Sequence, residues 1–317
     1  MIGRVSIIIP VYNVAEYIEE CLISVFNQTY SDIEVIVVND CSPDNSMGIV
    51  ENVKGQKNDS RIKIINHSEN KGLSEARNSG IRAASGEYLF FLDSDDRILP
   101  NSIEMLMSEC DGKDMAVGGI ITHENKSYSA LDNAIYYGAD AAGAFLKGKY
   151  YVMACNKLIK RNLIIDNNLY FMPGLLHEDN LWSYQLSKVC NSAVILRRPT
   201  YIDNIRGGSI TTDYTAKNIT HNIKWFNAVE YDILKKTPSN IEIGYLVRNK
   251  SDIKIMALKY AGFKLGEFKS MGFNNVRYPN IALPLNLKLR NILLKLPLLC
   301  QYSVFKMLIW LKRLFVK

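Results

Sequence analysis

The chain has 317 residues, of which 48% are hydrophobic and 22% are charged, and its formal net charge is +6 at pH 7. This is the composition of a globular protein with one large or two small cores, and it excludes a low-complexity chain. The six cysteines form no CxxC pair and no Cys/His metal spacing, so we expect reduced thiols in a cytosolic protein. We expect no signal peptide, because the apolar stretch at residues 5–11 is short, contains Pro10 and leads into polar residues.

Strand-like and helix-like patterns alternate over the first 120 residues. Apolar runs predict buried strands at residues 5–10, 34–40, 61–66, 87–93 and 114–122. Apolar residues at helical spacing predict helices at residues 15–28, 42–56, 72–86 and 101–112. Because short connections join these elements, we predict an α/β fold with right-handed crossovers and a doubly wound, mainly parallel sheet.

The periodicity is weaker in the rest of the chain. We expect an element at residues 156–161, a loop at 171–179, a helix at 180–189 and a strand at 192–198. The pattern at residues 217–272 predicts helices, and apolar and basic residues alternate in blocks from Pro284 on. We therefore predict a helical C-terminal region, residues 216–317, with a basic amphipathic tail at residues 284–317.

Polar residues follow four of the predicted strands, at residues 10–13, 39–40, 66–67 and 93–95. Doubly wound sheets bind ligands outside the carboxyl ends of their strands, so we expect these residues to line one cleft. Asp93 and Asp95 are two residues apart and point the same way on an extended segment. Two such charges are costly to bury unless a cation or hydrogen-bond donors offset them, which favours Mg²⁺ or Mn²⁺. The alternative is a solvated acidic loop, and we expect Asp96 to cap or to pair with Arg97.

Several motifs, in this order and spacing, resemble one known family: "IIIPVYN", "SVFNQTY", "EVIVVNDCSPDNS", "NKGLSEARNSGIRAASGEYLFFLDSDD" and "HED". They resemble the inverting, nucleotide-sugar-dependent glycosyltransferases of family 2, which have a GT-A fold. Many members build bacterial surface polysaccharides such as O-antigen or capsule. The resemblance is dense over about residues 3–100 and thinner through about residue 215. It implies a GT-A catalytic domain at residues 1–215, with nucleotide-sugar binding at about 1–122 and the acceptor and catalytic part at about 123–215.

The resemblance implies roles for residues that would bind the nucleotide. Pro10 and Tyr12 would form the wall against which the base lies, and Asp40 would accept a hydrogen bond from the base, which favours uracil. Arg77 would lie near the base or the diphosphate. Arg206, in "RGGSIT", resembles a position near the diphosphate or the acceptor.

The resemblance also implies roles for the acids. Asp93 would face the ribose, with Ser94 beside it in the nucleotide-sugar site, and Asp95 would hold Mn²⁺ or Mg²⁺. Asp179 would be the catalytic base, with Glu178 next to it. In glycosyl transfer a cation stabilises the charge that develops on the departing diphosphate, and a carboxylate base activates the acceptor hydroxyl. A single base on the face opposite the leaving group gives inversion.

We therefore predict an enzyme, a metal-dependent glycosyltransferase that uses a UDP-sugar and a saccharide acceptor. One alternative is a sugar-1-phosphate nucleotidyltransferase, which the sequence after the first strand disfavours because it has no glycine-rich phosphate loop. The other is an inactive nucleotide-binding scaffold of a polysaccharide assembly complex, which the presence of Asp95 and Asp179 disfavours.

The C-terminal tail carries most of the positive charge. Seven Lys and Arg residues and no acid occur from residue 281 to 317, so the rest of the chain is nearly neutral. Its longest charge-free stretch, residues 296–305, is far shorter than the roughly 20 residues of a spanning helix. We expect amphipathic helices on an anionic membrane surface, with Trp310 at headgroup depth, which suits a lipid-linked acceptor and a peripheral location on the inner face of the plasma membrane. A hairpin packed on the body or in a homo-oligomer interface is the alternative. Nucleic acid is not an expected partner, because aliphatic residues interrupt the basic ones.

Overall fold

The computed structural model describes residues 3–57, 60–122, 133–204, 215–259, 262–273, 277–279 and 282–315. The chain divides into two compact units. Unit 1 comprises Met1–Gly174 and Glu178–Arg206, and unit 2 comprises Leu175–His177 and Gly207–Lys317.

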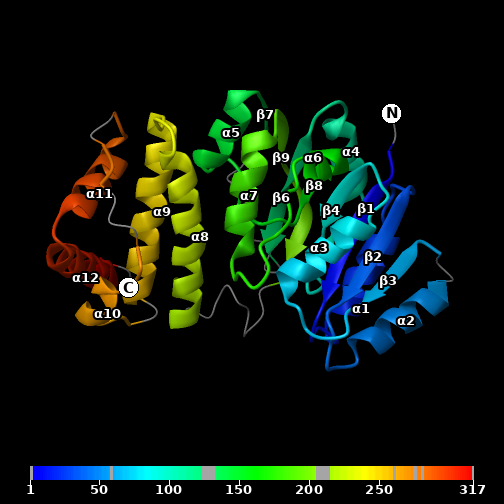
Figure 1. Ribbon diagram of the computed structural model, residues 1–317. Coiled ribbons are helices and arrows are strands. Elements are labelled where there is room, and N and C mark those ends of the chain that lie inside the picture. Colours follow the sequence, from blue (N-terminus) through cyan, green and yellow to red (C-terminus); the bar gives the residue numbers. More distant parts are fainter. Residues whose placement is uncertain are drawn as a thin grey trace. The chain divides into compact units, whose positions relative to one another are not determined.

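The described part of unit 1 contains one nine-stranded sheet in the order β3-β2-β1-β4-β8-β6-β9-β5, with β7 also paired to β9 (Figure 1). Its strands are β1 (Val5–Val11), β2 (Ile33–Asn39), β3 (Ile62–Asn66), β4 (Tyr88–Phe91), β5 (Arg97–Ile98), β6 (Met115–Thr122), β7 (Ala134–Tyr137), β8 (Lys157–Lys160) and β9 (Ser192–Asp203). Its helices are α1 (Ile18–Phe26), α2 (Ser46–Lys57), α3 (Leu73–Ala83), α4 (Ser102–Cys110), α5 (Ala139–Leu146), α6 (Arg161–Asp166) and α7 (Glu178–Val189).

The first four strands form the parallel half of the sheet that the sequence predicts. β1 pairs in parallel with β2 and β4, and β2 pairs in parallel with β3. The register aligns Val11 with Asn39 and Asn39 with Asn66, so these three strands end at the same edge. β1 is buried along its whole length, as expected for a parallel strand covered on both faces.

The second half of the sheet is mixed, which the alternating pattern did not indicate. β8 lies between β4 and β6 and is antiparallel to both, so the fifth predicted strand, β6, is not a neighbour of β4. β6 instead pairs in parallel with β9. The physical reason is that β8 inserts between β4 and β6 and pairs with both. Because β8 has only four residues, its sequence does not indicate which strands it pairs with or in which direction it runs.

Helices cover the sheet as in a doubly wound fold. α3 packs on β1 and β2, and α4 packs on β6 and β9. In Figure 1, α3 and α7 lie on the near side of the sheet. The helices that carry Arg77 and the pair Glu178–Asp179 therefore lie on the same side of the sheet.

Unit 2 is helical in its described residues, as predicted. It contains α8 (Ala216–Leu234), α9 (Asn240–Lys259), α10 (Leu265–Lys269), α11 (Leu285–Lys295) and α12 (Leu298–Phe315). No helix in the described part of the chain has the length and apolar character needed to cross a bilayer. Two buried pairs of polar side chains join these helices. Lys250 of α9 donates to Glu230 of α8 at 3.0 Å, and Lys254 of α9 donates to Gln301 of α12 at 2.7 Å.

The tail packs on the rest of unit 2 through one of its faces. α11 and α12 both contact α9, and Leu293 and Phe305 join Leu258 and Phe268 in one apolar cluster. Gln301 donates to the carbonyls of Leu294 and Leu296 and so ties α12 to the end of α11. This packing agrees with the alternative of a hairpin packed on the body, whereas binding of the tail to a membrane surface stays a prediction. The side chain of Trp310 lies outside the described residues.

Candidate active site

The predicted ligand-binding edge is present at the carboxyl ends of the parallel strands. The backbone N–H of Asp40 donates to Val11, and that of His67 donates to Asn39, so the residues after β1, β2 and β3 lie side by side. Pro10 is buried within β1, and Tyr12, which follows that strand, is 47% exposed. An exposed aromatic ring beside a buried strand end offers a flat apolar surface, as expected for a wall against a nucleotide base.

Asp40 is buried at this edge and is held in place by several donors. Its Oδ1 atom accepts hydrogen bonds from the backbone of Lys71 at 2.8 Å and from the His67 ring at 2.7 Å. Its Oδ2 atom accepts one from the backbone of Gly72 at 2.8 Å. Because a carboxylate oxygen accepts two hydrogen bonds, Oδ2 retains the capacity for one more donor, such as the N–H of a base.

The acids after β4 form a tight turn at the same edge. Asp93 lies two residues beyond the end of β4, and its carbonyl accepts the backbone N–H of Asp96 at 3.0 Å. Ser94 is buried, whereas Asp93 and Asp95 are half-buried, and the carbonyl of Asp95 accepts a hydrogen bond from Asn204 at 2.6 Å. This turn carries two half-buried acids at the edge, and the side chain of Asn204, which follows β9, binds its backbone.

Asp96 does not pair with Arg97, contrary to expectation. Arg97 pairs with Glu20 at 2.9 Å, and Asp96 is buried, where it accepts hydrogen bonds from the Tyr201 hydroxyl at 2.7 Å and the backbone of Asn204 at 2.8 Å. Burial, together with the charges of the two preceding acids, raises the pKa of Asp96 to about 9. Asp96 is therefore a structural support for the turn, in its protonated form near neutral pH.

Arg77 joins this turn to the start of α7. Its guanidinium is 1% exposed and donates to Asp93 at 2.8 Å, to Glu178 at 2.6 Å and to Asp179 at 2.9 Å. The three carboxylates come from segments that are far apart in the sequence, and Arg77 and Glu178 are 101 residues apart. The predicted base and the predicted ribose-binding acid therefore belong to one cluster, which we call the carboxylate cluster (Arg77, Asp93, Glu178 and Asp179).

The cluster is rigidly supported by its surroundings. Asn78 is buried, and its side chain both donates to and accepts from the backbone of Phe171, at 2.9 and 2.8 Å, so it is not available to the nucleotide. The Phe171 ring stacks on Trp182 of α7 at 4.6 Å, and both rings meet Phe91 of β4 edge-on at 5.5 and 5.6 Å. Aromatic packing of this kind fixes the start of α7 against the end of β4.

One guanidinium faces three carboxylates, which sets the electrostatics of the cluster. Glu178 is buried, and burial together with the charge of Asp179 raises the pKa of Glu178 to about 7 despite the opposing effect of Arg77. The exposed fraction of the Asp179 side chain is larger, and its Oδ2 atom accepts no hydrogen bond from the residues that the structure describes. Asp179 thus combines partial exposure with a free acceptor oxygen, as a general base requires.

The backbone is strained next to several of these residues. Asn13, Cys41, Asn156 and His177 have positive φ values of 54°, 58°, 57° and 58°. Asn13 follows Tyr12, Cys41 follows Asp40, Asn156 precedes the first residue of β8, and His177 precedes Glu178. Left-handed backbone is unfavourable for residues other than glycine, and it concentrates at functional sites where the surrounding structure imposes it.

A family model described as glycosyl transferase family 2 matches residues 6–166 of the 317. The chain belongs to this family. EpsH of Bacillus subtilis (strain 168) is 36% identical to it over 223 residues, which cover 67% of this chain and 64% of EpsH. The chain therefore spans less than two thirds of the length of this relative.

Solved structures with little sequence identity show the same fold as this family 2 chain. TarS 1–349 of S. aureus in complex with UDP-GlcNAc has a TM-score of 0.67 and 22% identity, over 83% of this chain and 77% of that one. The mannosyltransferase PcManGT of Pyrobaculum calidifontis, in complex with GDP-Man and Mn²⁺, has a TM-score of 0.58 and 17% identity, over 99% of this chain and 88% of that one. The predicted GT-A fold is confirmed by this likeness.

The acids of the family 2 domain fit a divalent ion of a particular kind. Within the described ranges, no three His, Cys, Asp or Glu side chains are grouped so as to hold a metal by themselves. Asp93 and Asp95 nevertheless supply hard oxygen ligands from one turn, and Mg²⁺ takes one or two carboxylates and completes its coordination with water and phosphate. The residues present fit an ion that arrives with a diphosphate.

Sequence reasoning assigned no individual contact to two residues of this region, His67 and Tyr201. His67 fixes Asp40 and is itself bound by Ser79 at 2.9 Å, and its position after a predicted strand was the available signal. Tyr201 supports the acidic turn from β9, and nothing in its local sequence indicates this. Arg206, which was assigned to the diphosphate or acceptor, lies outside the described residues.

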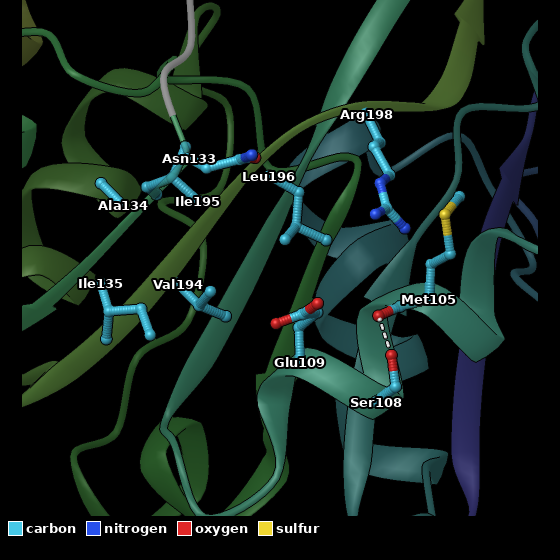
Figure 2. A pocket seen from close by; sticks show the side chains of 10 residues that line it. All are labelled: Met105, Ser108, Glu109, Asn133, Ala134, Ile135, Val194, Ile195, Leu196 and Arg198. Atoms are coloured by element: carbon cyan, nitrogen blue, oxygen red, sulfur yellow. Dashed lines mark hydrogen bonds between the residues drawn. The ribbon is translucent and has the colours of Figure 1, made fainter.

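The cavity in Figure 2 is separate from these acids. It has a volume of about 370 Å³, and α4, β7 and β9 contribute most of its lining, including Glu109, Ile135 and Arg198. None of its lining residues belongs to the carboxylate cluster or to the acidic turn. The candidate active site of the family 2 domain is therefore defined by its charged residues, and this cavity does not mark it.

Proposed function

We propose that this chain transfers a sugar from a UDP-sugar to a hydroxyl group of a saccharide acceptor, with inversion, in the synthesis of a surface polysaccharide. The observation that carries the proposal is the carboxylate cluster. Arg77 binds Asp93, at the edge where a nucleotide sugar would lie, and also binds Asp179, the proposed base. Family membership, the GT-A fold and the UDP-GlcNAc complex of the structural neighbour TarS support the same function.

In the proposed reaction Asp179 takes the proton of the acceptor hydroxyl as that oxygen attacks the anomeric carbon. Its Oδ1 atom is held by Arg77, which leaves Oδ2 to accept the proton. The α7 N-terminus stabilises the negative charge of the base through its backbone dipoles. A base of this kind contributes roughly 10²–10⁴-fold to a rate. One carboxylate that acts opposite the leaving diphosphate produces inversion without a covalent intermediate.

Donor recognition in this proposal uses the strand ends. Tyr12 and Pro10 contact the base, Asp40 accepts its N–H, and Asp93 binds the ribose beside Ser94. Asp95 would hold Mn²⁺ or Mg²⁺, which supplies electrostatic stabilisation of the departing diphosphate when it is bound. The complex of the neighbour PcManGT with GDP-Man and Mn²⁺ makes the GDP-sugars the donors to test beside the UDP-sugars.

A donor screen tests the proposal directly. The full chain is incubated with UDP-glucose, UDP-galactose, their N-acetyl forms and GDP-mannose, with Mn²⁺ or Mg²⁺ and oligosaccharide acceptors, and nucleoside diphosphate is measured. UDP release that depends on the metal and is lost in Asp95→Ala supports the proposal. Pyrophosphate formation from a sugar 1-phosphate and UTP would instead support a nucleotidyltransferase. UDP binding without any turnover would support a scaffold.

The proposal includes a lipid-linked acceptor at an anionic membrane surface on the cytoplasmic side, and the tail supplies the argument for it. α11 exposes the large apolar residues Leu285, Leu289 and Ile292 at spacings of four and three, and Leu296 and Leu299 are exposed where α11 passes into α12. Lys288 and Lys306 are exposed on the same helices, and residues 281–317 contain no acid. An apolar stripe with basic residues and no acids is typical of helices that lie in a membrane interface.

Point variants test the tail better than truncation, because removal of α11 and α12 would expose Leu258 and Phe268. The triple variant Leu285→Gln, Leu289→Gln, Ile292→Gln changes only exposed side chains. It should sediment with vesicles of anionic phospholipid several-fold less than the wild type, at unchanged thermal stability. The control is Ile135→Gln with Tyr137→Gln in β7, since Ile135 and Ile292 are both 50% exposed. Equal sedimentation of all three proteins would contradict membrane binding by the tail, and a change from dimer to monomer would identify a second copy of the chain as the partner.

A further inference from the structure

The turn after β1, residues 12–15, carries Tyr12 and is held by side chains of another segment. Three consecutive backbone N–H groups of the turn donate to side chains at the start of α2. The pairs are Asn13 with Ser42 at 2.8 Å, Val14 with Ser46 at 3.1 Å, and Ala15 with Asp44 at 2.8 Å. Asn13 has a left-handed backbone, with φ 54°, which costs free energy for a residue other than glycine. The turn therefore depends on these three contacts to keep its conformation.

Asp44 sets the direction of the hydrogen bonds in this contact. Its Oδ1 atom accepts from the hydroxyls of Ser42 and Ser46, each at 2.6 Å, and its Oδ2 atom accepts from Ala15. A hydroxyl has one proton to donate, so a serine that donates to Asp44 can only accept from the turn. One carboxylate thus orients both serines of the group, which we call the serine–aspartate bridge (Ser42, Asp44 and Ser46).

The carboxylate of the serine–aspartate bridge is stable in its ionised form. Burial opposes the charge of Asp44, but the hydrogen bonds from Ser42, Ser46 and two backbone N–H groups outweigh this effect and lower the pKa of Asp44 to about 2. An ionised carboxylate can only accept hydrogen bonds, so both hydroxyl protons stay directed toward it. Because Ser46 and Val14 are buried, the turn cannot exchange these contacts for water without a cost in free energy.

We propose that Asp44 is a positioning residue for donor binding, which fixes the turn after β1 through Ser42 and Ser46 and so holds the Tyr12 ring in place against the nucleotide base. The inference rests on the proposed function, in which Tyr12 is part of the base wall. Tyr12 is 47% exposed and directly precedes Asn13, the first residue that the bridge binds. A wall that is fixed before the ligand arrives binds it more tightly, because less conformational freedom is lost on binding.

The test compares UDP affinity, measured by calorimetry in the presence of Mn²⁺, for Asp44→Ala, Tyr12→Ala and the double variant. Tyr12→Ala should weaken binding roughly ten-fold, since it removes the surface on which the base stacks. Asp44→Ala should weaken it about five-fold, because the ring is present but no longer held. The double variant should bind within about two-fold of Tyr12→Ala, since a residue that acts through Tyr12 then has nothing to position. In the transfer assay, Asp44→Ala should raise the donor KM by a similar factor and change kcat less than about two-fold.

Glu34→Ala is the matched control. Glu34 lies near the first residue of β2, at the opposite end of that strand from Asp40. Like Asp44, it accepts hydrogen bonds from two serine hydroxyls and two backbone N–H groups. Its loss should lower the melting temperature, as the loss of Asp44 should, but it should leave UDP affinity within about two-fold of that of the wild type. If Asp44→Ala does not fold, Ser42→Ala replaces it, since it removes the partner of the Asn13 N–H and keeps the carboxylate.

The possible outcomes separate this inference from the function on which it rests. UDP affinity of Asp44→Ala equal to that of the wild type, or a loss that simply adds to the loss in Tyr12→Ala, would overturn this inference alone. Unchanged UDP affinity in Tyr12→Ala would remove the proposed base wall and this inference with it. A wild type that binds neither UDP nor GDP would overturn the proposed function itself.

Discussion

Replacement of Arg77 by methionine tests the central claim about the site, that one buried cation holds three acids together. Arg77→Met keeps most of the apolar stem and removes the guanidinium. Glu178, which is 7% exposed, then loses its partner at 2.6 Å, and Asp93 and Asp179 lose theirs at 2.8 and 2.9 Å. Breaking a buried ion pair by removal of one partner costs about 3–5 kcal/mol, because a buried charge remains uncompensated.

This loss is large enough to measure in two ways. A domain the size of unit 1 loses about 2–4 °C of melting temperature per kcal/mol, so the midpoint should fall by roughly 6–20 °C. Urea unfolding, followed by near-ultraviolet circular dichroism, gives the free energy directly. The difference between variant and wild type should shrink at about pH 5 compared with pH 8, because protonation removes the unpaired negative charges.

Two further variants make the Arg77 experiment specific. Arg82→Met removes an arginine from the same helix, but Arg82 is half exposed, so its pair with Glu75 should be worth less than about 1 kcal/mol. The double variant Arg77→Met, Glu178→Gln should recover about 1–3 kcal/mol of the loss, since it removes one of the stranded charges. A cost for Arg77→Met below about 1 kcal/mol, or the same cost at both pH values, would refute the reasoning.

Three other predictions each concern one charged side chain. Asp179→Asn should lower kcat by about 10²–10⁴-fold with UDP affinity unchanged in calorimetry, and turnover near that of the wild type would place the base elsewhere. Asp96→Asn should be more stable than the metal-free wild type at pH 8 in urea unfolding: the folded pKa of Asp96 is raised to about 9, so the wild type loses stability as pH rises from about 4 toward 9, and the variant does not. An advantage that is independent of pH would count against that assignment. Lys250→Met should cost about 3–5 kcal/mol in the same assay, because Glu230, which is 0% exposed, then loses its paired cation and keeps the hydrogen bond from Tyr278, and Glu230→Gln in the same chain should restore much of the loss.

The sequence predicts the parallel half of unit 1 well because its signals are local. Each strand from β1 to β4 is a short apolar run that ends in polar residues, and the intervening helices carry apolar stripes and caps. Once those strands are taken as parallel, their polar ends must share one edge, and the structure has Asp40, His67 and the Asp93 turn there. The placement of β6 beside β8 depends on pairing between short strands, which no local pattern records.

The interior of the site was less accessible to sequence reasoning, since the decisive contacts are long-range. In "LSEARNSG" an arginine on a helix is also consistent with a solvated face, and its burial depends on acids 16, 101 and 102 residues away. The predicted nucleotide contacts of Pro10, Tyr12, Arg77 and Ser94 stay predictions, as does the metal at Asp95.

The long separation between Arg77 and Glu178 also constrains how the protein can fold. A shortened chain that stopped at residue 166 would contain the whole region matched by the family model, yet it would lack α7 and β9. The guanidinium of Arg77 would keep only Asp93, the edge of β6 would have no parallel neighbour, and the ring of Phe91 would meet neither Phe171 nor Trp182. During synthesis, Arg77 can therefore pair with Asp93 first, and it meets Glu178 and the proposed base, Asp179, only when the segment that completes the fold has been made.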